Sequence, residues 1–340
     1  MSTAIQIVEV RPATHEETAF IDLPGAIYAD NPHYVPWFRR QMRAIVARRH
    51  PFFEHSDGAF FIARRGEHTV GRIALLEPRR FNEYNHERDA RFYFFECEDD
   101  REAAHALFRH GAEWARQRGL RRLVGPQGFS GFAGSGILIH GFDRTASMTM
   151  MPYHLPYYRD LVESFGFEPH QDFHSPYLDA STHDLSPRYV RAAGIVRKRG
   201  RFHVPELRSK GELRALAHEI GTTYNEAWRD RENFTPITEA ELKGMVDDLL
   251  LVTRPDLIRV LRAGGELAGF VLAFPDLSPA MVRAGGRLTP LSYLRLIREK
   301  HTTRRFIING LGIKPAYRRA GGTALLVYEI TKILKEHQVE

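Results

Sequence analysis

The stretch that most constrains the fold of this chain is Phe306–Gln338, FIINGLGIKPAYRRAGGTALLVYEITKILKEHQ. It opens with an apolar run broken by Gly310 and Gly312, which predicts a buried strand that is interrupted or bulged at its glycines. A basic, glycine-rich turn, Arg318–Thr323, follows, and apolar residues then recur at helical spacing. A strand, a glycine turn and a helix N-terminus form an anion site, because backbone N–H groups point outward and the helix dipole adds positive potential.

The charge of the chain agrees with an anionic ligand but does not require one. Arg318 and Arg319 can add charge-assisted hydrogen bonds to a phosphate, and the formal net charge is +6. Such a charge suits an anionic ligand, a membrane surface or an ordinary basic protein. Lysines and arginines are spread along the whole chain, so we expect no nucleic-acid partner. The histidines have no metal-ligand spacing, so we expect no metal site.

The length of 340 residues favours two domains. The expected elements repeat, since both halves contain a strand, two helices, a hairpin, a strand and a long helix. In the first half we expect a hairpin of Ala59–Ala63 with Val70–Leu76, an amphipathic helix at Asp100–Arg118 and a last strand at His170–Leu178. In the second half we expect a strand at Arg201–Leu207, a helix at Lys210–Trp228 and a helix at Thr238–Val252 that begins with a capping box of Thr238 and Glu241.

The polar, turn-rich segment Ala180–Pro187 is the best candidate boundary. We therefore predict an N-terminal domain at 1–179, a linker at 180–190 and a C-terminal domain at 191–340. Because the second half stops after its long helix, we expect that domain to lack its last strands.

Cys97 is the single cysteine, which excludes an intrachain disulfide and favours a reducing compartment. No apolar run approaches the roughly 18–20 residues that span a bilayer. We expect a cytoplasmic protein, with peripheral contact to the inner membrane left open and the oligomeric state unknown. The basic helix expected at Phe38–Arg49 is a candidate for such contact, although a solvated face is commoner. Core packing is favoured over an acyl channel or bilayer contact for five nearby aromatic residues: Tyr34, Trp37, Phe38, Phe52 and Phe53.

This order of elements resembles the GNAT superfamily of acyl-CoA N-acyltransferases, whose acyl-CoA-binding turn follows the pattern Q/R-x-x-G-x-G/A. Arg318–Thr323 matches the arginine and the first glycine, with Thr323 where Gly or Ala is usual. Tyr157–Phe167 resembles the penultimate helix of the superfamily and its Gly-Phe ending. More narrowly, the chain resembles a bacterial family of tandem-GNAT-domain proteins, in which a segment like Phe20–Pro32 precedes a Pro-Phe-Phe-Glu-His element, here Pro51–His55. Some members of that family are proposed to be bacterial ceramide synthases.

The resemblance implies an α/β fold of the α+β type: two tandem GNAT domains, each with a mixed, mostly antiparallel sheet flanked by helices. The two halves differ at the phosphate turn, because the first half has the acidic run Glu96–Glu102 there. Carboxylates at a helix N-terminus suit the helix dipole but repel a pyrophosphate. We therefore expect the first half to be a degenerate domain that shapes the substrate site, and the second half to bind acyl-CoA.

By the same resemblance, acyl-CoA or acetyl-CoA is the co-substrate and an amine is the acceptor. The N–H groups of Leu311, Gly312 and Ile313 are expected to hold the pantetheine arm and polarise the thioester carbonyl. The pyrophosphate would lie against the N–H groups of the turn, with the two arginines assisting: Arg318, Arg319, Ala320, Gly321, Gly322 and Thr323.

The acceptor amine must be neutral to attack, so a carboxylate or water has to take its proton. Glu226, Asp276 and Glu232 are candidate bases, although each is more often an ordinary surface carboxylate. The tyrosine that often serves the superfamily as general acid would fall beyond Glu340, so that role is unassigned.

Three functions follow from the sequence. The first is an acyl-CoA-dependent N-acyltransferase that acts by direct attack in a ternary complex, with a lipid amine such as a sphingoid base as one possible acceptor. The second is a non-catalytic acyl-CoA-binding or scaffold protein. The third is a tRNA-dependent aminoacyl transferase of the tandem-GNAT type, against which the missing basic helical arm and the intact acyl-CoA turn weigh.

Overall fold

The computed structural model describes residues 4–130, 134–179 and 184–337. Gln338, at the end of the strand–turn–helix stretch, and the first four residues of the predicted linker lie outside these ranges. The chain divides into an N-terminal unit, Met1–His174 with Ser278–Leu294, and a C-terminal unit, Ser175–Leu277 with Arg295–Glu340. One segment of the C-terminal half therefore packs with the N-terminal unit.

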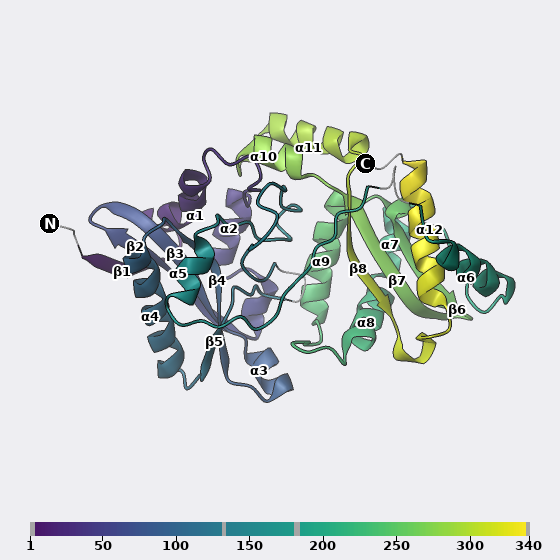
Figure 1. The fold of residues 1–340 in the computed structure, drawn as a ribbon, viewed down its shortest axis with the longest axis horizontal. Coiled ribbons are helices and arrows are strands. Elements are labelled where there is room, and N and C mark those ends of the chain that lie inside the picture. Colours follow the sequence, from purple (N-terminus) through teal and green to yellow (C-terminus); the bar gives the residue numbers. More distant parts are fainter. Residues whose placement is uncertain (1–3, 131–133, 180–183, 338–340) are drawn as a thin grey trace. The chain divides into compact units, whose positions relative to one another are not determined.

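The N-terminal unit contains a five-stranded mixed sheet in the order β1-β2-β3-β4-β5 (Figure 1). Its strands are β1 (Ile5–Glu9), β2 (Asp57–Arg65), β3 (His68–Glu77), β4 (Asp89–Cys97) and β5 (Arg122–Val124). Neighbouring strands are antiparallel except β4 and β5, which are parallel. The predicted hairpin is confirmed, because β2 and β3 pair on either side of a turn at Gly66, where φ is 63°. A positive φ is a conformation that glycine adopts without steric cost.

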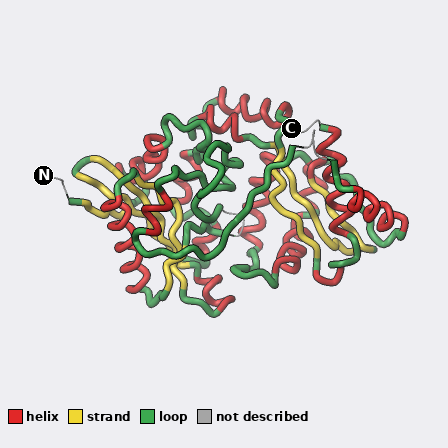
Figure 2. The backbone as a smooth tube through the Cα atoms, in the orientation of Figure 1, coloured by secondary structure: helices red, strands yellow, loops and turns green. Residues whose placement is uncertain are grey.

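Helices cover both faces of this sheet. The unit contains α1 (His15–Ile27), α2 (Arg39–Val46), the 3₁₀ turn η1 (Pro51–Glu54), α3 (Arg79–Asn85), α4 (Arg101–Gln117) and α5 (Tyr158–Glu163). On one face α4 buries Leu107, Phe108 and Trp114, as its amphipathic pattern predicted. On the other face Phe52 is buried with residues of α1 and α2, so the core-packing interpretation of this aromatic residue is confirmed. Apart from short turns, the described parts of residues 125–157 form an irregular loop (Figure 2).

Pro24 lies inside α1 and does not end it. A proline at this position has no N–H to donate to the carbonyl of Phe20, four residues earlier. The guanidinium of Arg72 donates to that carbonyl instead, with Nη1 at 2.8 Å from the oxygen. The helix therefore continues because a buried side chain from β3 satisfies the freed carbonyl.

The described part of the C-terminal unit has a three-stranded antiparallel sheet in the order β6-β7-β8. Its strands are β6 (Ile258–Ala263), β7 (Glu266–Pro275) and β8 (Phe306–Ile313). One face packs against α8 (Ala217–Trp228), next to which lies α9 (Glu239–Val252); the other packs against α12 (Gly322–Glu336), which lies beside α6 (Pro187–Lys198) (Figure 1). The capping box predicted for α9 is confirmed, because Thr238 and Glu241 exchange both hydrogen bonds.

Two helices, α10 (Ser278–Ala284) and α11 (Pro290–Thr302), lie in the chain between β7 and β8. The Ser278 hydroxyl accepts from the N–H of Met148 (2.7 Å) and donates to the carbonyl of Ala146 (2.9 Å). The carbonyl of Gly286 accepts from the N–H of Arg39 (2.9 Å). These contacts attach α10 and the turn after it to the N-terminal unit.

Several predictions of secondary structure were wrong. His170–Leu178 is not a strand, and its side chains are exposed. Arg201–Leu207 contains only an isolated bridge from His203, since Pro205 has no N–H for a ladder. The helix expected at Lys210–Trp228 is two helices, α7 (Lys210–Ala215) and α8. The helices α3, α6 and α10 were not predicted, and α6 begins at Pro187, within the predicted linker. No helix among the described residues is both long and apolar enough to cross a membrane.

Candidate functional site

β8 is an edge strand, and among the described residues only β7 pairs with it. The register shifts in its middle, where Leu272 pairs with Gly310 but Ala273 pairs with Ile308. Asn309 is thus an extra residue in β8, and the strand bulges beside its first glycine, as predicted.

The N–H groups of β8 alternate between β7 and the unpaired edge. The N–H of Lys314 donates to the carbonyl of Ala268 in the β7 direction (2.9 Å). Because the direction alternates along an antiparallel strand, the N–H of Gly312 also points to β7, and those of Leu311 and Ile313 point to the unpaired edge. Two of the three N–H groups predicted to hold a pantetheine arm therefore face the unpaired edge.

The two glycines of β8 allow α8 to approach the sheet closely. A Cβ at Gly312 would lie 3.2 Å from Ala227 Cβ and 3.0 Å from the Phe270 ring. A Cβ at Gly310 would lie 3.6 Å from the indole of Trp228. The glycine pattern in this strand therefore has a packing role in addition to its role at the bulge.

The turn after β8 has a backbone suited to an anion. Arg319 and Gly321 have φ of 62° and 87°, and Gly321 is the N-cap of α12. Glycine has no side chain with which to cap the helix, so the first N–H groups of α12, which have no intrahelical acceptor, receive no side-chain cap. A Cβ at Gly321 would lie 2.4 Å from Val196 Cγ2, because α6 packs against this position.

The two arginines of the turn have different environments. Arg318 donates through Nη2 to the carbonyl of Ala227 (2.7 Å) and through Nη1 to Asp230 (3.3 Å). It therefore ties the turn to the C-terminal end of α8. Arg319 is exposed at the turn itself.

Lys314, directly after β8, is buried between two carboxylates. Its Nζ lies 2.6 Å from Glu266 and 3.1 Å from Glu226. Burial lowers the pKa of Lys314, but the hydrogen bonds to Glu266 and Glu226 outweigh burial and leave this pKa raised. Glu226, a predicted base, is thus engaged in an ion pair that it would have to give up to take a proton.

The structure does not bring the three candidate bases together. The N–H of Asp276 donates to the carbonyl of Arg305 (2.8 Å), which directly precedes β8. Glu226 contacts Lys314 at the other end of this strand, and eight residues of strand extend about 25 Å. Glu232 is exposed between α8 and α9. Asp276 and Glu226 therefore cannot serve one amine together.

The corresponding helix of the N-terminal unit, α4, has a capped N-terminus. The carboxylate of Asp100 accepts from the N–H of Ala103 (3.1 Å). Arg65 pairs with Asp100 (2.7 Å) and with Glu102 (2.9 Å). An acidic side chain thus occupies the N-terminus of this helix, the position at which a phosphate would bind.

The fourth strand of the N-terminal unit also bulges, which was not predicted from the sequence. Arg72 pairs with Glu96 but Ala74 pairs with Tyr93, so β4 has one extra residue. Phe94 within the bulge has φ of 48°. No glycine marks this bulge, so the sequence contains no local signal for it.

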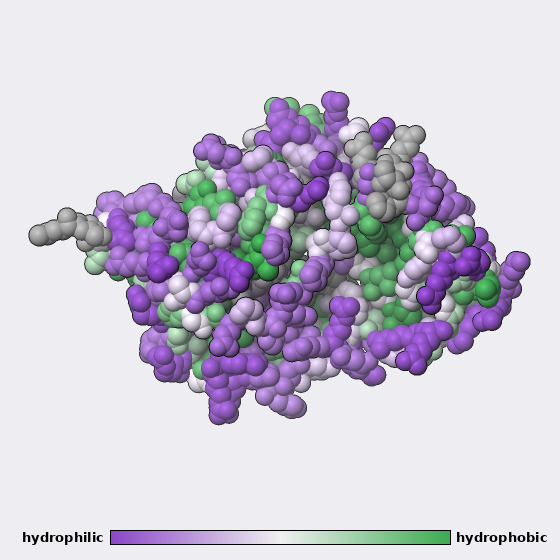
Figure 3. Space-filling view, in the orientation of Figure 1, coloured by the Kyte–Doolittle hydropathy of each residue, from purple (hydrophilic) through white to green (hydrophobic). Residues whose placement is uncertain are grey.

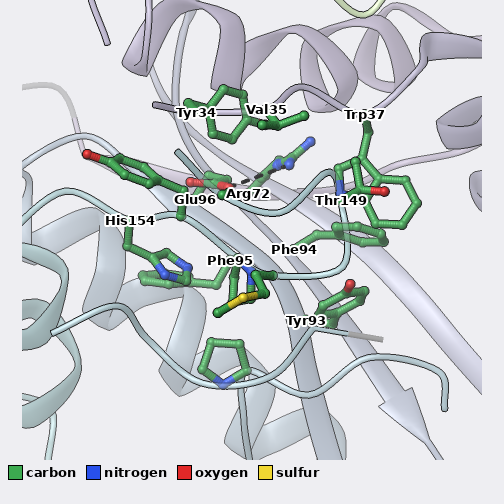
Figure 4. A pocket seen from close by; sticks show the side chains of 15 residues that line it. Tyr34, Val35, Trp37, Arg72, Tyr93, Phe94, Phe95, Glu96, Thr149 and His154 are labelled. Carbon is green, nitrogen blue, oxygen red and sulfur yellow. Dashed lines mark ion pairs between the residues drawn. The ribbon is translucent and has the colours of Figure 1, made fainter. Parts of the chain in front are cut away.

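A small pocket lies beside this bulge, with a buried ion pair in its wall (Figure 4). Arg72 lies 3.8 Å from Glu96, whose Oε2 accepts from the hydroxyls of Tyr28 (2.6 Å) and Tyr158 (2.7 Å). Burial raises the pKa of Glu96, while Arg72 and the two hydroxyls lower it, and the balance leaves it raised. The cavity of about 50 Å³ has room for a few water molecules but not for a pantetheine arm.

No family model matches the chain. It is 30% identical to the bacterial ceramide synthase of Caulobacter vibrioides over 285 residues, which cover 82% of this chain and 72% of that one. It is 25% identical to Protein YghO of Escherichia coli over 279 residues, 82% of this chain and 70% of that one.

Two solved structures are distantly similar. A tandem GNAT protein from the clavulanic acid biosynthesis pathway aligns with a TM-score of 0.49 and 14% identity, covering 99% of this chain and 88% of that one. The C-terminal domain of a putative lysylphosphatidylglycerol synthetase from Agrobacterium fabrum aligns with a TM-score of 0.36 and 11% identity, covering 96% and 78%. On the strength of its relative from Caulobacter, this chain belongs to the tandem-GNAT family of acyltransferases that its sequence resembles.

Proposed function

We propose that this acyltransferase moves an acyl group from an acyl-CoA thioester to an amine, and that the C-terminal unit holds the acyl-CoA. The observation that supports this best is the continuity of three features. The unpaired edge of β8 leads into a turn with two left-handed residues and then into the uncapped N-terminus of α12. Acyl-CoA matches these features in that order, because its extended pantetheine arm fits the strand edge and its pyrophosphate fits the turn and the helix N-terminus.

Each part of the proposed site has one task. The N–H groups of Leu311 and Ile313 hydrogen-bond the pantetheine arm and, near the bulge, the thioester oxygen, where N–H donors stabilise developing negative charge. The N–H groups of the α12 first turn and the guanidinium of Arg319 bind the pyrophosphate. Arg318 keeps the turn against α8 through the carbonyl of Ala227.

The transfer is a direct attack in a ternary complex. The amine nitrogen forms a bond to the thioester carbon, the C–S bond breaks, and CoA leaves as a thiolate that takes a proton from solvent. The proton lost by the amine passes to water or to Asp276, which lies towards the thioester end of β8, because Glu226 is held by Lys314 at the pyrophosphate end. The Caulobacter relative is named a ceramide synthase, which favours a lipid amine such as a sphingoid base as acceptor and peripheral contact with the membrane.

The test is a pair of substitutions at Thr323, an exposed residue in the first turn of α12. Thr323→Glu places a carboxylate beside the proposed pyrophosphate, while Thr323→Gln has nearly the same size without the charge. The glutamate itself suits the helix dipole, so folding is preserved. At about 5 Å and an effective dielectric of 20–80, one like charge costs about 1–3 kcal/mol, or about tenfold in affinity.

We expect calorimetry to show CoA binding to the wild-type and Thr323→Gln proteins, and binding about tenfold or more weaker for Thr323→Glu. Equal affinities for all three would refute the site. Release of CoA thiol from acyl-CoA in the presence of sphinganine, but not with the amine left out, tests the transfer itself.

A further inference from the structure

The helix α11 has its apolar side turned outward. The exposed fractions of its large apolar side chains are 57% for Leu291, 60% for Tyr293, 63% for Leu294 and 42% for Ile297. At 100° per residue these four lie within an arc of about 160°. Figure 3 shows apolar surface at the top of the view, where α11 lies, between hydrophilic side chains.

The side of α11 opposite this stripe contains Ser292, Glu299 and one apolar residue, the half-buried Leu296. Ser292 is the buried residue of the helix, and its hydroxyl accepts from the N–H of Thr289 (2.7 Å) and donates to the carbonyl of Arg287 (2.9 Å). A surface helix ordinarily turns its apolar side to the core, as α12 does with Leu326 and Ile330. In α11, by contrast, four of the five large apolar side chains are exposed, and packing among the described residues does not bury them.

The segment around the stripe is strongly basic. Residues 278–305 contain seven arginines and lysines and one glutamate, a formal charge of +6 that equals the net charge of the whole chain. Arg295 and Arg298 are exposed on α11 itself, on either side of Leu291 at one border of the stripe. An apolar stripe bordered by cations is the pattern of helices that lie in the interface of an anionic bilayer.

The charge also argues against a second copy of this chain as the occupant. In a symmetric dimer the same patch faces itself, so two segments of charge +6 would be brought together. The basic helix α2 is a weaker candidate for lipid, because Arg39 pairs with Asp22, and Arg48, two residues beyond the helix, pairs with Asp57.

We propose that α11 docks this protein onto anionic phospholipid bilayers, with Leu291, Leu294 and Ile297 in the acyl boundary and Arg295 and Arg298 at the phosphates. This deepens the membrane contact proposed above and assigns it a surface. It requires neither CoA binding nor acyl transfer, so each can fail without the other.

Co-sedimentation with vesicles tests the proposal. The probe vesicles are phosphatidylcholine with phosphatidylglycerol, and phosphatidylcholine alone is the neutral comparison. We expect the wild-type protein to bind the anionic vesicles more tightly, and Leu294→Ser with Ile297→Ser to weaken this binding about tenfold or more. Arg295→Gln with Arg298→Gln should weaken binding to anionic vesicles and reduce its salt dependence.

The matched control is Val190→Ser with Ile195→Ser on α6, whose side chains are 43% and 52% exposed. These two lie about 140° apart on a basic helix and form no stripe, so this variant should bind vesicles like the wild type. All variants should retain the wild-type circular dichroism, and Thr323→Glu should bind vesicles normally.

Three outcomes would overturn the proposal. The stripe variant could bind vesicles as well as the wild type, or the wild type could fail to bind anionic vesicles. Sedimentation velocity could also show a wild-type dimer that the stripe variant abolishes, which would assign the stripe to a second copy.

Discussion

Gly321 is where the proposed phosphate turn meets α6, and replacing it with alanine tests that geometry. Its φ of 87° costs an alanine about 1–2 kcal/mol. The new Cβ would also lie 2.4 Å from Cγ2 of the buried Val196. Overpacking a buried position adds about 1–3 kcal/mol, so Gly321→Ala should destabilise this region by about 2–5 kcal/mol.

The control is Gly200→Ala in the same unit. Gly200 has φ of 64°, and a Cβ there would meet nothing within 4 Å. This variant therefore bears only the backbone cost of about 1–2 kcal/mol. Adding Val196→Ala to Gly321→Ala removes the clash and should give a favourable coupling energy of about 1–3 kcal/mol.

Hydrogen exchange resolved by peptide measures the local free energy of opening in α6 and α12 without assuming that both units unfold together. A change of 1.4 kcal/mol corresponds to about tenfold in protection. If Gly321→Ala and Gly200→Ala lowered protection in α6 and α12 equally, or if Val196→Ala gave no rescue, α6 would not lie over the turn.

Two further predictions concern the N-terminal unit. Burial raises the pKa of the single thiol, Cys97, so we expect Ellman's reagent to react with it in urea but not in the native protein; rapid native labelling would contradict its burial. Burial lowers the pKa of His154 to about 3, against about 6.5 when unfolded. Because the folded pKa is the lower one, the neutral imidazole of His154 contributes its full stabilisation above about pH 6.5. As the pH falls below that value, the contribution decreases by about 1.4 kcal/mol per pH unit. Local opening energies measured by hydrogen exchange at pH 7 and near pH 5 should fall less in His154→Gln, and an unchanged slope would refute the assignment.

The sequence predicted those elements of the fold that local patterns encode. The β2–β3 hairpin follows from Gly66 between two apolar runs, and α9 from the capping box of Thr238 and Glu241. By contrast, α10 contains no amphipathic stripe and is held by the contacts of Ser278 with the chain near Met148, 130 residues away. The false strand at His170–Leu178 shows the same limit, since a strand needs a partner that local alternation does not supply.

The site divides in the same way. The strand β8, the glycine turn after it and the start of α12 are local features, and the structure contains them where the sequence predicted them. The orientation of the Arg318 side chain is not set by its neighbours in the sequence, because its acceptor, the carbonyl of Ala227, lies 91 residues earlier in the chain. The pair Arg72–Glu96 depends on strand register, so neither residue could be singled out from its own surroundings.

Comparison of the two fourth strands supports the C-terminal unit as the site of acyl-CoA binding. Both β4 and β8 bulge, and each is followed by a helix. In the N-terminal unit the carboxylate of Asp100 caps that helix, and the pocket at the bulge has room only for a few water molecules. In the C-terminal unit the N-cap of the helix is Gly321, which provides no side-chain cap, and β8 has an unpaired edge within the described residues. The cap and the space beside the strand depend on different residues, and both differences favour the same unit.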